Sequence, residues 1–412
     1  MTSPADLRDA CRAVLDAVSL MPAEDCPLSD CAGRIAAQSV AASENVPDVE
    51  RSPYDGYALR SEDTCGASAE HPAVLKIVEE IPAGGVPFRP LERGACARIL
   101  TGAPLPPGAD AVIKFEDTVF TPEMVSVFRA LRPEENVVAA GENLKKGDLI
   151  VSAGSMIDPG VMGACASQGM TSLSVFRRPC AAVLPVGSEI CPEGQMPVPG
   201  AIRDVNGPLF RSALQRDGFL SLACAPAPDV PAKIAEAVEA ILPRCSALIV
   251  TGGVSVGDYD LTAQTLEDMG AQIIVRNIAV KPGGKCCYAL LQGKLIAALS
   301  GNPLSAFTNF CAVMLPALRK MSGLKDFLPA RLSLPLAEPF PKKSPLERLI
   351  HGKILFREGR LLFQPARHQG NGAVLALASC TALARIPSGS PPLQAGTLLE
   401  TLPYAPGTAP FF

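Results

Sequence analysis

The chain has little of what several common kinds of chemistry require. Its 412 residues include three histidines and no tryptophan. With so few histidines, a Ser–His–Asp or Cys–His catalytic arrangement is not indicated. The net charge is −4, so the basic excess of a general nucleic-acid or anionic-membrane binder is missing. A locally basic pocket remains compatible with this balance.

Long apolar runs and zinc-type cysteine spacings are also missing. No stretch of about 18 apolar residues occurs, so the sequence predicts no membrane-spanning helix. The first residues lead into an amphipathic pattern without the apolar core of a signal peptide. The 14 cysteines include no CxxC pair and no Cys/His cluster. We therefore expect a soluble cytoplasmic protein whose reduced thiols fill core space.

What is present is a change of pattern along the chain. Apolar residues recur at helical spacing from Leu7 to Val18, after an expected N-cap at Ser3. Residues 26–132 are dense in proline and glycine around short apolar runs, which favours a β-rich module. From residue 178 strands alternate with helices, which predicts βαβ units and a largely parallel sheet. Short strands return after residue 325 and predict a small C-terminal β domain.

The most informative motif lies at residues 248–260. An apolar run ends at Gly252 and Gly253, and two carboxylates, Asp258 and Asp260, precede a helical segment. This pattern predicts a buried strand, a turn and a helix start, where backbone N–H groups favour a negative ligand. A carboxylate there is placed to meet a bound cation or the phosphates it carries.

Other motifs each have a plain structural alternative. Asp55 in the tight turn of Ser52–Arg60 is read either as a functional carboxylate or as an Asx turn. Thr101 ends a predicted strand, where its hydroxyl either binds phosphate or caps a turn. Lys281 and Lys285 flank a Pro-Gly-Gly turn, which is either an anion clamp or a solvated loop.

The start of a long apolar helix at residues 299–305 adds a further site. Ser305 and the neighbouring backbone N–H groups are placed to hold an oxyanion, whereas a helix-capping role for Asn302 or Ser305 is the alternative. Scattered acids also follow the strands of the α/β region. Several such acids in equivalent loops raise the odds of a shared Mg²⁺ site. These acids are Glu189, Asp204 and Asp229.

Taken in order, the motifs resemble those of the molybdopterin molybdenumtransferase family (MoeA, and the related domain of gephyrin). The resemblance covers roughly residues 5–400. The segments that carry it are Ser52–Arg60, Ile99–Pro104, Gly141–Asn143, Gly187–Glu189, Asp204–Asn206, Gly252–Gly257 with Asp260, Lys281–Gly283 and Gly301–Ser305.

The resemblance implies an elongated multidomain chain of α/β and β-rich domains. The α/β domain would be of the molybdopterin-binding type, the β-rich domain would be inserted, and the C-terminal domain would be β-barrel-like. The implied division is residues 1–25 with 133–175, then 26–132, 176–325 and 326–412. It further implies a homodimer whose active cleft lies between the α/β domain of one subunit and the inserted domain of the other.

The implied reaction is insertion of molybdate into adenylated molybdopterin, with Mg²⁺-assisted release of AMP. A molybdopterin adenylyltransferase and acceptor molybdoenzymes are the implied partners. Carried over by motif, the catalytic residues are Asp55, Thr101, Asp260 and Lys281. The residues that the resemblance implies contact the cofactor are Gly252, Gly253, Ser255, Gly257, Asp204, Asn206, Gly301, Asn302, Pro303, Ser305 and Arg348. The implied metal ligands are Glu189, Asp229 and Asp260.

The chain departs from the family pattern at several of these motifs. Asn143 stands where many members have Asp, and Ser300 replaces a usual proline. An extra glycine displaces Lys285, and Asn371 stands where serine is common. Three alternatives therefore remain open from the sequence: a molybdopterin adenylyltransferase, a tungstate-specific enzyme, and a non-catalytic cofactor-binding paralogue.

Overall fold

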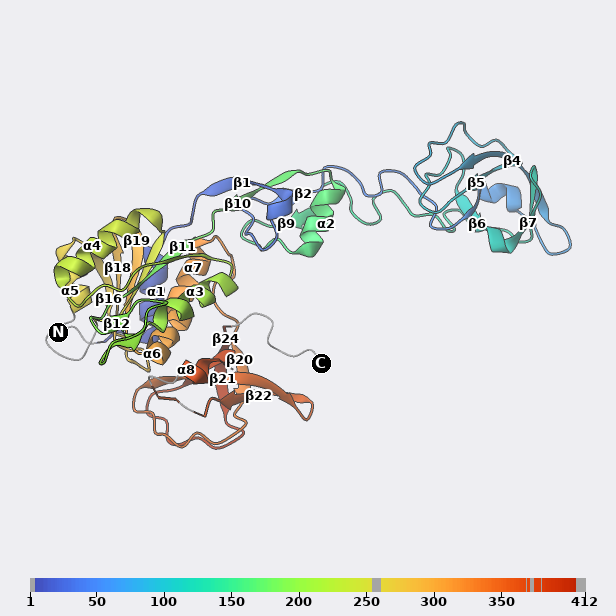
Figure 1. Ribbon diagram of the computed structural model, residues 1–412. Helices are drawn as coiled ribbons and strands as arrows, with labels where there is room; N and C mark the ends of the chain where they lie inside the picture. Colours follow the sequence, from blue (N-terminus) through green and yellow to red (C-terminus); the bar gives the residue numbers. More distant parts are fainter. Residues whose placement is uncertain (1–3, 254–260, 368, 371–373, 379, 405–412) are drawn as a thin grey trace.

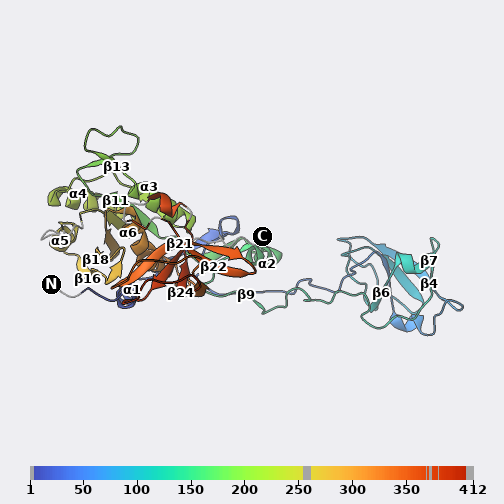
Figure 2. The ribbon, with the colours of Figure 1, turned by 90° about the horizontal axis from the view of Figure 1, so that it is seen from below.

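The computed structural model describes residues 4–253, 261–367, 369–370, 374–378 and 380–404, and it is elongated. An α/β body lies at one end, with the C-terminal sheet beside it, and a narrow link leads to a small β module at the other end (Figure 1). A second view keeps the same separation (Figure 2). The predicted combination of an α/β domain with β-rich domains is confirmed.

The α/β body is built on a six-stranded sheet. In spatial order its strands are β14 (Leu220–Ala223), β11 (Cys180–Pro185), β15 (Ala247–Thr251), β19 (Lys294–Leu299), β18 (Cys286–Leu291) and β16 (Gln272–Arg276). The first four are parallel to one another, β18 is antiparallel to both of its neighbours, and β16 therefore runs in the same direction as the first four. Strand β18, which the sequence analysis missed, joins β19 through Gln292 and Gly293, both at positive φ, as in a type I′ hairpin turn.

Alternating residues of the sheet separate two cores. Ala247 and Ile249 of β15 face one core, and Leu248 and Val250 face the other. The first core is covered by α1, α3 and the long helical segment, and the second by α4 and α5. The bounds of these helices are α1 (Leu7–Ala17), α3 (Asn206–Arg216), α4 (Pro231–Ile241) and α5 (Leu261–Asp268).

Helix α1 differs in two ways from the prediction. It begins at Leu7 because Asp6 accepts a hydrogen bond from the backbone N–H of Arg8 and so serves as N-cap; the expected N-cap, Ser3, lies outside the described residues. Its buried face packs into the α/β core rather than against residues 133–175, with which it was grouped.

The long helix predicted after Pro303 has three parts. They are α6 (Pro303–Asn309), the π-helical segment η5 (Phe310–Met314) and α7 (Leu315–Met321). Pro316 has no N–H to continue the helical ladder, so the regular pattern is interrupted near this point. The carbonyl of Ala312, four residues earlier, is contacted instead by the thiol of Cys11 at 3.7 Å.

The link and the distant module follow different pairings. In the link, β1 (Ala23–Pro27) pairs with β10 (Ser172–Phe176), and β2 (Val40–Ala41) pairs with β9 (Leu149–Val151), beside α2 (Pro159–Ser167). Residues 26–41, which the sequence analysis grouped with the inserted module, are therefore bonded to the link. The distant module is a second six-stranded sheet. Its strands in order are β6 (Ala111–Lys114), β3 (Gly56–Leu59), β5 (Ala95–Ile99), β4 (Ala73–Ile81), β8 (Met124–Val127) and β7 (Thr118–Phe120).

The C-terminal sheet includes one strand contributed by the α/β region. Its order is β17 (Val280–Lys281), β21 (Glu347–Arg357), β23 (Ala382–Ile386), β24 (Leu398–Pro403) and β20 (Leu332–Pro335), with β22 (Arg360–Pro365) paired to β21. Because β17 follows β16 of the first sheet, backbone hydrogen bonds join the two domains directly.

Candidate functional site

Three parallel strands of the α/β sheet end at the same level. Pro185 pairs with Thr251, and Thr251 pairs with Leu299, so the loops that follow them lie side by side. Ligands of open α/β sheets bind at this edge, beyond the carboxyl ends of the strands. The motifs at 186–189, 252–253 and 300–302 all begin there.

Gly252 and Gly253 are required by close packing. Both have positive φ, 101° and 67°. A Cβ atom on Gly252 would lie 2.0 Å from the carbonyl oxygen of Val186, and one on Gly253 would lie 2.2 Å from Oγ1 of Thr262. No side chain fits in either place, so the backbone itself lines this edge of the sheet. Ser255, Gly257 and Asp260, predicted to complete the site, lie outside the described residues.

Two buried oxygen atoms at this edge have no hydrogen-bond partner among the described residues. Asn206 donates from Nδ2 to the carbonyl oxygen of Gly301 at 2.9 Å, which leaves its Oδ1 unpaired. Thr251 is fully buried, and its Oγ1 is also unpaired. Buried polar atoms normally have partners, so these two oxygens indicate that a ligand, water or ion completes the site.

The predicted acids have distinct positions. Asp204 accepts from the N–H of Gly207 at 2.9 Å and so caps the first turn of α3. Asp229 accepts from the N–H of Ser188 at 2.9 Å, and the N–H of Asp229 donates back to Oγ of Ser188. Glu189, next in sequence to Ser188, is exposed. The structure therefore ties the 186–189 loop to the Asp229 loop.

Oxygen donors of this kind are those that Mg²⁺ prefers. The carboxylates of Glu189 and Asp229 lie in loops, the unpaired oxygen of Asn206 lies at the start of α3 and that of Thr251 at the end of β15, so the donor chemistry fits the ion. Among the described residues, no three His, Cys, Asp or Glu side chains form a group that would hold a metal. Asp260, the remaining predicted ligand, lies outside those residues.

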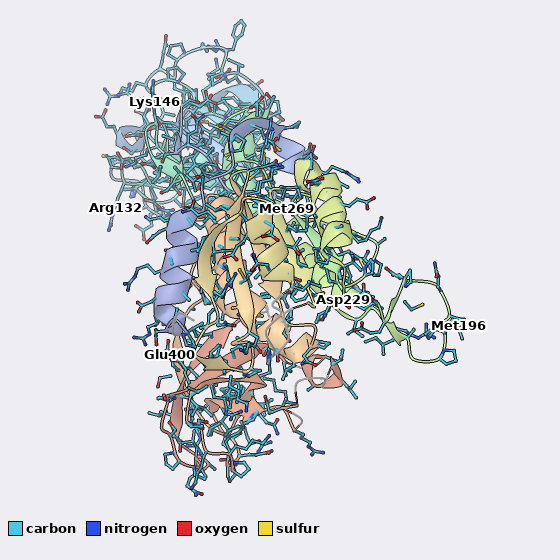
Figure 3. The ribbon with its side chains drawn as sticks, turned by 90° about the vertical axis from the view of Figure 1, so that its left-hand side faces the viewer. Arg132, Lys146, Met196, Asp229, Met269 and Glu400 are labelled. Carbon is cyan, nitrogen blue, oxygen red and sulfur yellow. The ribbon has the colours of Figure 1, made fainter. Side chains whose placement is uncertain are left out.

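A loop beside these acids projects from the body. Residues 192–201 connect β12 (Ile190–Cys191) to β13 (Ile202–Arg203), and Met196 lies at its far end, with Asp229 nearer the body (Figure 3). Arg211 donates to Glu193 at 2.6 Å near the base of this loop. A cavity of about 180 Å³ lies there, lined by Val183, Pro192, Glu193, Asp204, Gly207, Arg211, Ala223, Cys224, Ala225 and Pro226.

Two basic residues meet where the α/β body joins the C-terminal sheet. Strand β17 pairs in parallel with β21, and Lys281 is the register partner of Arg348. Arg348 is held by a hydrogen bond from Nε to Oγ of Ser344 at 3.1 Å, and its guanidinium lies 5.9 Å from the ring centre of Phe340. The structure thus brings together two residues that are 67 positions apart in the sequence (348 − 281).

The turn after Lys281 packs on the start of α6. A Cβ atom on Gly283 would lie 2.8 Å from the carbonyl oxygen of Ser305, and one on Gly284 would lie 2.6 Å from the carbonyl oxygens of Ile278 and Val280. The glycine that departs from the family pattern therefore has a structural reason. Lys285 is exposed beyond the turn. Ser305 is buried, which places it next to the Lys281 turn rather than in solvent.

The capping alternative for Asn302 is not supported. Asn302 is the N-cap residue of α6, yet its side chain makes no capping hydrogen bond, and Pro303 occupies the first turn. The backbone N–H of Asn302 instead donates to Oγ of Ser300 at 3.2 Å. Ser300, a departure from the family pattern, therefore supports this turn. Asn143 is exposed in the link region, and Asn371 lies outside the described residues.

Asp55 and Thr101 form the predicted pair in the distant module. One oxygen of Asp55, Oδ1, accepts from both the N–H and the hydroxyl of Thr101, each at 2.7 Å. These bonds lower the pKa of Asp55, and Arg98 adds to the effect, so the carboxylate is ionised at neutral pH. The pair is exposed, and its module is remote from the α/β edge of the same chain (Figure 1).

His351, for which the sequence indicates no role, is fully buried in β21. Its Nε2 lies 2.8 Å from Oγ1 of Thr308, which donates its own hydrogen to the carbonyl oxygen of Leu304. His351 therefore donates from Nε2, and Nδ1 accepts from the hydroxyl of Tyr404 at 3.2 Å. Burial lowers the pKa of His351 to about 3, so it is uncharged and joins α6 to the C-terminal sheet.

No described helix combines the length and the apolar character that crossing a membrane requires. Three family descriptions match consecutive parts of the chain. They are "MoeA N-terminal region (domain I and II)" at residues 5–169, "Probable molybdopterin binding domain" at residues 182–320 and "MoeA C-terminal region (domain IV)" at residues 333–404.

Known proteins match over nearly the whole length. Two relatives are named molybdopterin molybdenumtransferase. The one from Staphylococcus epidermidis is 33% identical over 375 residues, covering 91% of this chain and 90% of its own. The one from Staphylococcus aureus is 30% identical over 401 residues, covering 97% and 96%. A crystal structure of the molybdopterin biosynthesis MoeA protein from Pyrococcus horikoshii is 29% identical with a TM-score of 0.87, covering 98% and 99%.

The glycine-lined edge of the parallel sheet, together with the match to a molybdopterin binding domain, places the chain in the molybdopterin-binding α/β class. Within that class the extent of identity and the three consecutive matches are specific. The chain belongs to the MoeA family of molybdopterin molybdenumtransferases.

Proposed function

We propose that this protein inserts molybdenum into molybdopterin, taking molybdate and adenylated molybdopterin as substrates and releasing AMP. The observation that carries the proposal is the meeting of Lys281 and Arg348 on paired strands beside the buried Ser305. Two cationic side chains near a buried serine suit a tetrahedral dianion such as molybdate. No feature of these residues separates molybdate from tungstate, so we expect both to bind.

The sheet edge lined by Gly252 and Gly253 supports the proposed binding of adenylated molybdopterin. Backbone N–H groups at Gly252 and Gly253, with those at Gly301 and Asn302, are suited to the pyrophosphate of the adenylated pterin. Of the two unpaired oxygens, the hydroxyl of Thr251 can donate a hydrogen bond to a phosphate oxygen, whereas Oδ1 of Asn206 can only accept and so suits a hydroxyl, an N–H group or a cation. Pro303 fixes the helix start behind them.

Glu189, Asp229 and Asp260 are proposed to hold Mg²⁺. When bound, the ion would offset the negative charge that develops as the phosphoanhydride breaks. The chain's own residues position the reactants: Lys281 and Arg348 hold the oxyanion, and the glycine loops orient the pyrophosphate. No covalent nucleophile is required by this chemistry, which agrees with the lack of a histidine-based triad.

The remote position of Asp55 and Thr101 supports a homodimer. Within one chain the module that carries them is separated from the sheet edge by the narrow link (Figures 1 and 2). A second copy, placed with its module over the sheet edge, would bring the ionised Asp55 to the cleft. We propose that both subunits contribute to each active site, and that an adenylyltransferase and acceptor molybdoenzymes are further partners.

The three alternatives left open by the sequence are not equally well supported. An adenylyltransferase built on the α/β domain alone would not require the N-terminal and C-terminal regions that match here. A non-catalytic role is disfavoured because the relatives are named as transferases over the full length. Tungstate specificity stays open.

The test is turnover by the pure protein. We expect adenylated molybdopterin to be consumed only when molybdate is present, with AMP and active cofactor formed in equal amounts, and we expect a chelator of Mg²⁺ to suppress the rate. Cofactor is measured by activation of a cofactor-free molybdoenzyme. ATP-dependent synthesis of adenylated molybdopterin, without its consumption, would instead establish the adenylyltransferase alternative.

A further inference from the structure

One buried amide connects two parts of the proposed oxyanion site. Asn309 is the last residue of α6, one turn after Ser305, and it is 3% exposed. Its Nδ2 donates to the carbonyl oxygen of Gly283 at 2.8 Å, and its Oδ1 accepts from the hydroxyl of Tyr288. Gly283 lies two residues after Lys281. Asn309 therefore joins the helix that carries Ser305 to the turn that carries Lys281.

The surroundings of Gly283 show why its carbonyl oxygen depends on Asn309 for a hydrogen bond. Gly283 is buried and has positive φ, 91°, so its turn adopts a conformation that few other residues tolerate. Its carbonyl oxygen, removed from water, needs a donor, and the amide of Asn309 supplies it. The regular helix ends at Asn309 and the π-helical segment begins at Phe310, a change that often accompanies a functional site.

Thr308, the residue before Asn309, makes the corresponding contact to β21, the strand that carries Arg348. Thr308 binds His351, which is three residues after Arg348 in β21. One helical turn thus contacts both chain segments that carry the basic residues. Asn309 acts on the Lys281 segment, and Thr308 acts on the Arg348 segment.

We propose that Asn309 is a positioning residue of the oxyanion site: its hydrogen bond to Gly283 fixes the Lys281 turn against the start of α6 and so sets the affinity for molybdate. The inference rests on the proposed function, because it assumes that Lys281 contacts the oxyanion. A displacement of the turn by a fraction of an ångström would move the ammonium group away from the dianion while leaving the pterin contacts in place.

The experiment compares variants of the full-length protein. Asn309→Asp keeps the size of the side chain and can still accept from Tyr288, but it has no donor for Gly283. Asn309→Ser is too short to span the gap and guards against misfolding of the first variant. Tyr288→Phe is the matched control, because it removes the other hydrogen bond of the same amide and leaves the bond to Gly283 intact. Thermal unfolding establishes that each variant is folded.

Binding of molybdate by calorimetry and the KM for molybdate in turnover are the two readouts. We expect the Asn309 variants to raise both constants by about tenfold or more, as loss of a supporting hydrogen bond does around bound ions. The KM for adenylated molybdopterin should stay unchanged. Tyr288→Phe should lower the unfolding temperature without moving the molybdate constants.

Lys281→Ala separates failure of this inference from failure of the proposed function. If Lys281→Ala weakens molybdate binding and the Asn309 variants do not, the positioning role is wrong and the oxyanion site stands. If Lys281→Ala has no effect on molybdate, the oxyanion site is wrong, and the positioning role is overturned with it. Equal increases of both KM values in the Asn309 variants would show a general structural role and would also overturn the inference.

Discussion

The two proposed halves of the active site are built in opposite ways. Asp55 and Thr101 lie beside neighbouring strands of one small sheet, and two hydrogen bonds join them within that module. Lys281 and Arg348 are neighbours only because a strand of the α/β region pairs with a strand of the C-terminal domain. The first half is set by local contacts and the second by the docking of two domains.

This difference determines what each half can tolerate. The Asp55 turn is exposed, and its geometry depends on Gly56, where a Cβ atom would lie 2.0 Å from the carbonyl oxygen of Ile113. The Lys281–Arg348 half depends on a buried framework that includes Asn309, Thr308 and His351. Damage to that framework should therefore reach the oxyanion site, whereas the Asp55 half should remain formed even if the C-terminal domain is loosened.

The largest effect is expected from Lys281→Ala. Removing a fixed charge that contacts the reacting oxyanion costs on the order of 100-fold to 1,000-fold in rate. We expect that loss in molybdate-dependent turnover, with the fold unchanged because the Lys281 side chain is exposed. Lys285→Ala, four residues later and also exposed, is the matched control and should stay within about threefold of wild type, since surface changes are usually mild. Similar losses in both variants would indicate a diffuse basic surface in place of a defined contact.

The next prediction tests whether the two halves come from different subunits. We expect Asp55→Ala and Lys281→Ala to be nearly inactive as separate proteins. Mixed and allowed to exchange subunits, they should form heterodimers in which one of the two clefts carries both native residues. Random exchange should then restore roughly a quarter of wild-type activity. If each cleft were formed within one chain, every cleft would lack one residue and mixing would restore nothing.

A smaller effect is expected from Thr101→Val. The hydroxyl of Thr101 is lost, but its backbone N–H still donates to Asp55. We expect turnover to fall by about tenfold, the lower range for a lost hydrogen bond to a charged group, and the pKa of Asp55 to rise towards its ordinary value. Thr101→Ser retains the hydroxyl and should be close to wild type. A loss as large as that of Asp55→Ala would mean that the hydroxyl itself contacts substrate.

The two halves also differ in how much of them the sequence predicts. Glycine turns after apolar runs predicted strand ends at Val250 and Ala298, within one residue of the observed ends at Thr251 and Leu299, because hydrophobic runs and turn residues are local signals. Local signals also predicted the Asp55 turn. The family resemblance implied a site role for Lys281 and for Arg348, but the sequence did not predict that their strands pair. Strand β17 has two residues, too few to show any periodicity, and its partner belongs to another domain.

The missed features have the same origin. Strand β18 reads as an apolar run that is helical or extended with equal ease, and its hairpin turn, Gln292-Gly293, is an uncommon signal. His351 lies in a strand whose sequence alternates only in part, and its partners Thr308 and Tyr404 are 43 and 53 residues away. Residues 26–41 precede the module in the sequence without any clear change of pattern, but they pair with the link. In each case the structure depends on contacts between residues far apart in the sequence, and local composition carries no information about such contacts.

The smallest expected effect concerns His351 and is an effect on stability, which tests the buried framework. Its pKa is about 3 in the folded protein and near its ordinary value of 6.5 when unfolded. Above pH 6.5 the imidazole is neutral in both the folded and the unfolded state, so keeping it neutral in the folded protein does not lower the free energy of unfolding. As the pH falls below 6.5 the unfolded state takes up a proton that the folded state does not, and folding should lose about 1.4 kcal/mol per pH unit until roughly pH 3.

The variant His351→Gln preserves the donor to Thr308 and the acceptor for Tyr404 but does not titrate. We expect its free energy of unfolding, measured by denaturant titration between pH 7 and pH 4, to fall less steeply than that of wild type by about that amount per unit. Tyr404→Phe is the control: it keeps the histidine and should keep the steep slope. Equal slopes in wild type and His351→Gln would mean that His351 is protonated in place. The C-terminal sheet would then be held on α6 by a charged contact, and the two halves of the site would differ less than the present geometry implies.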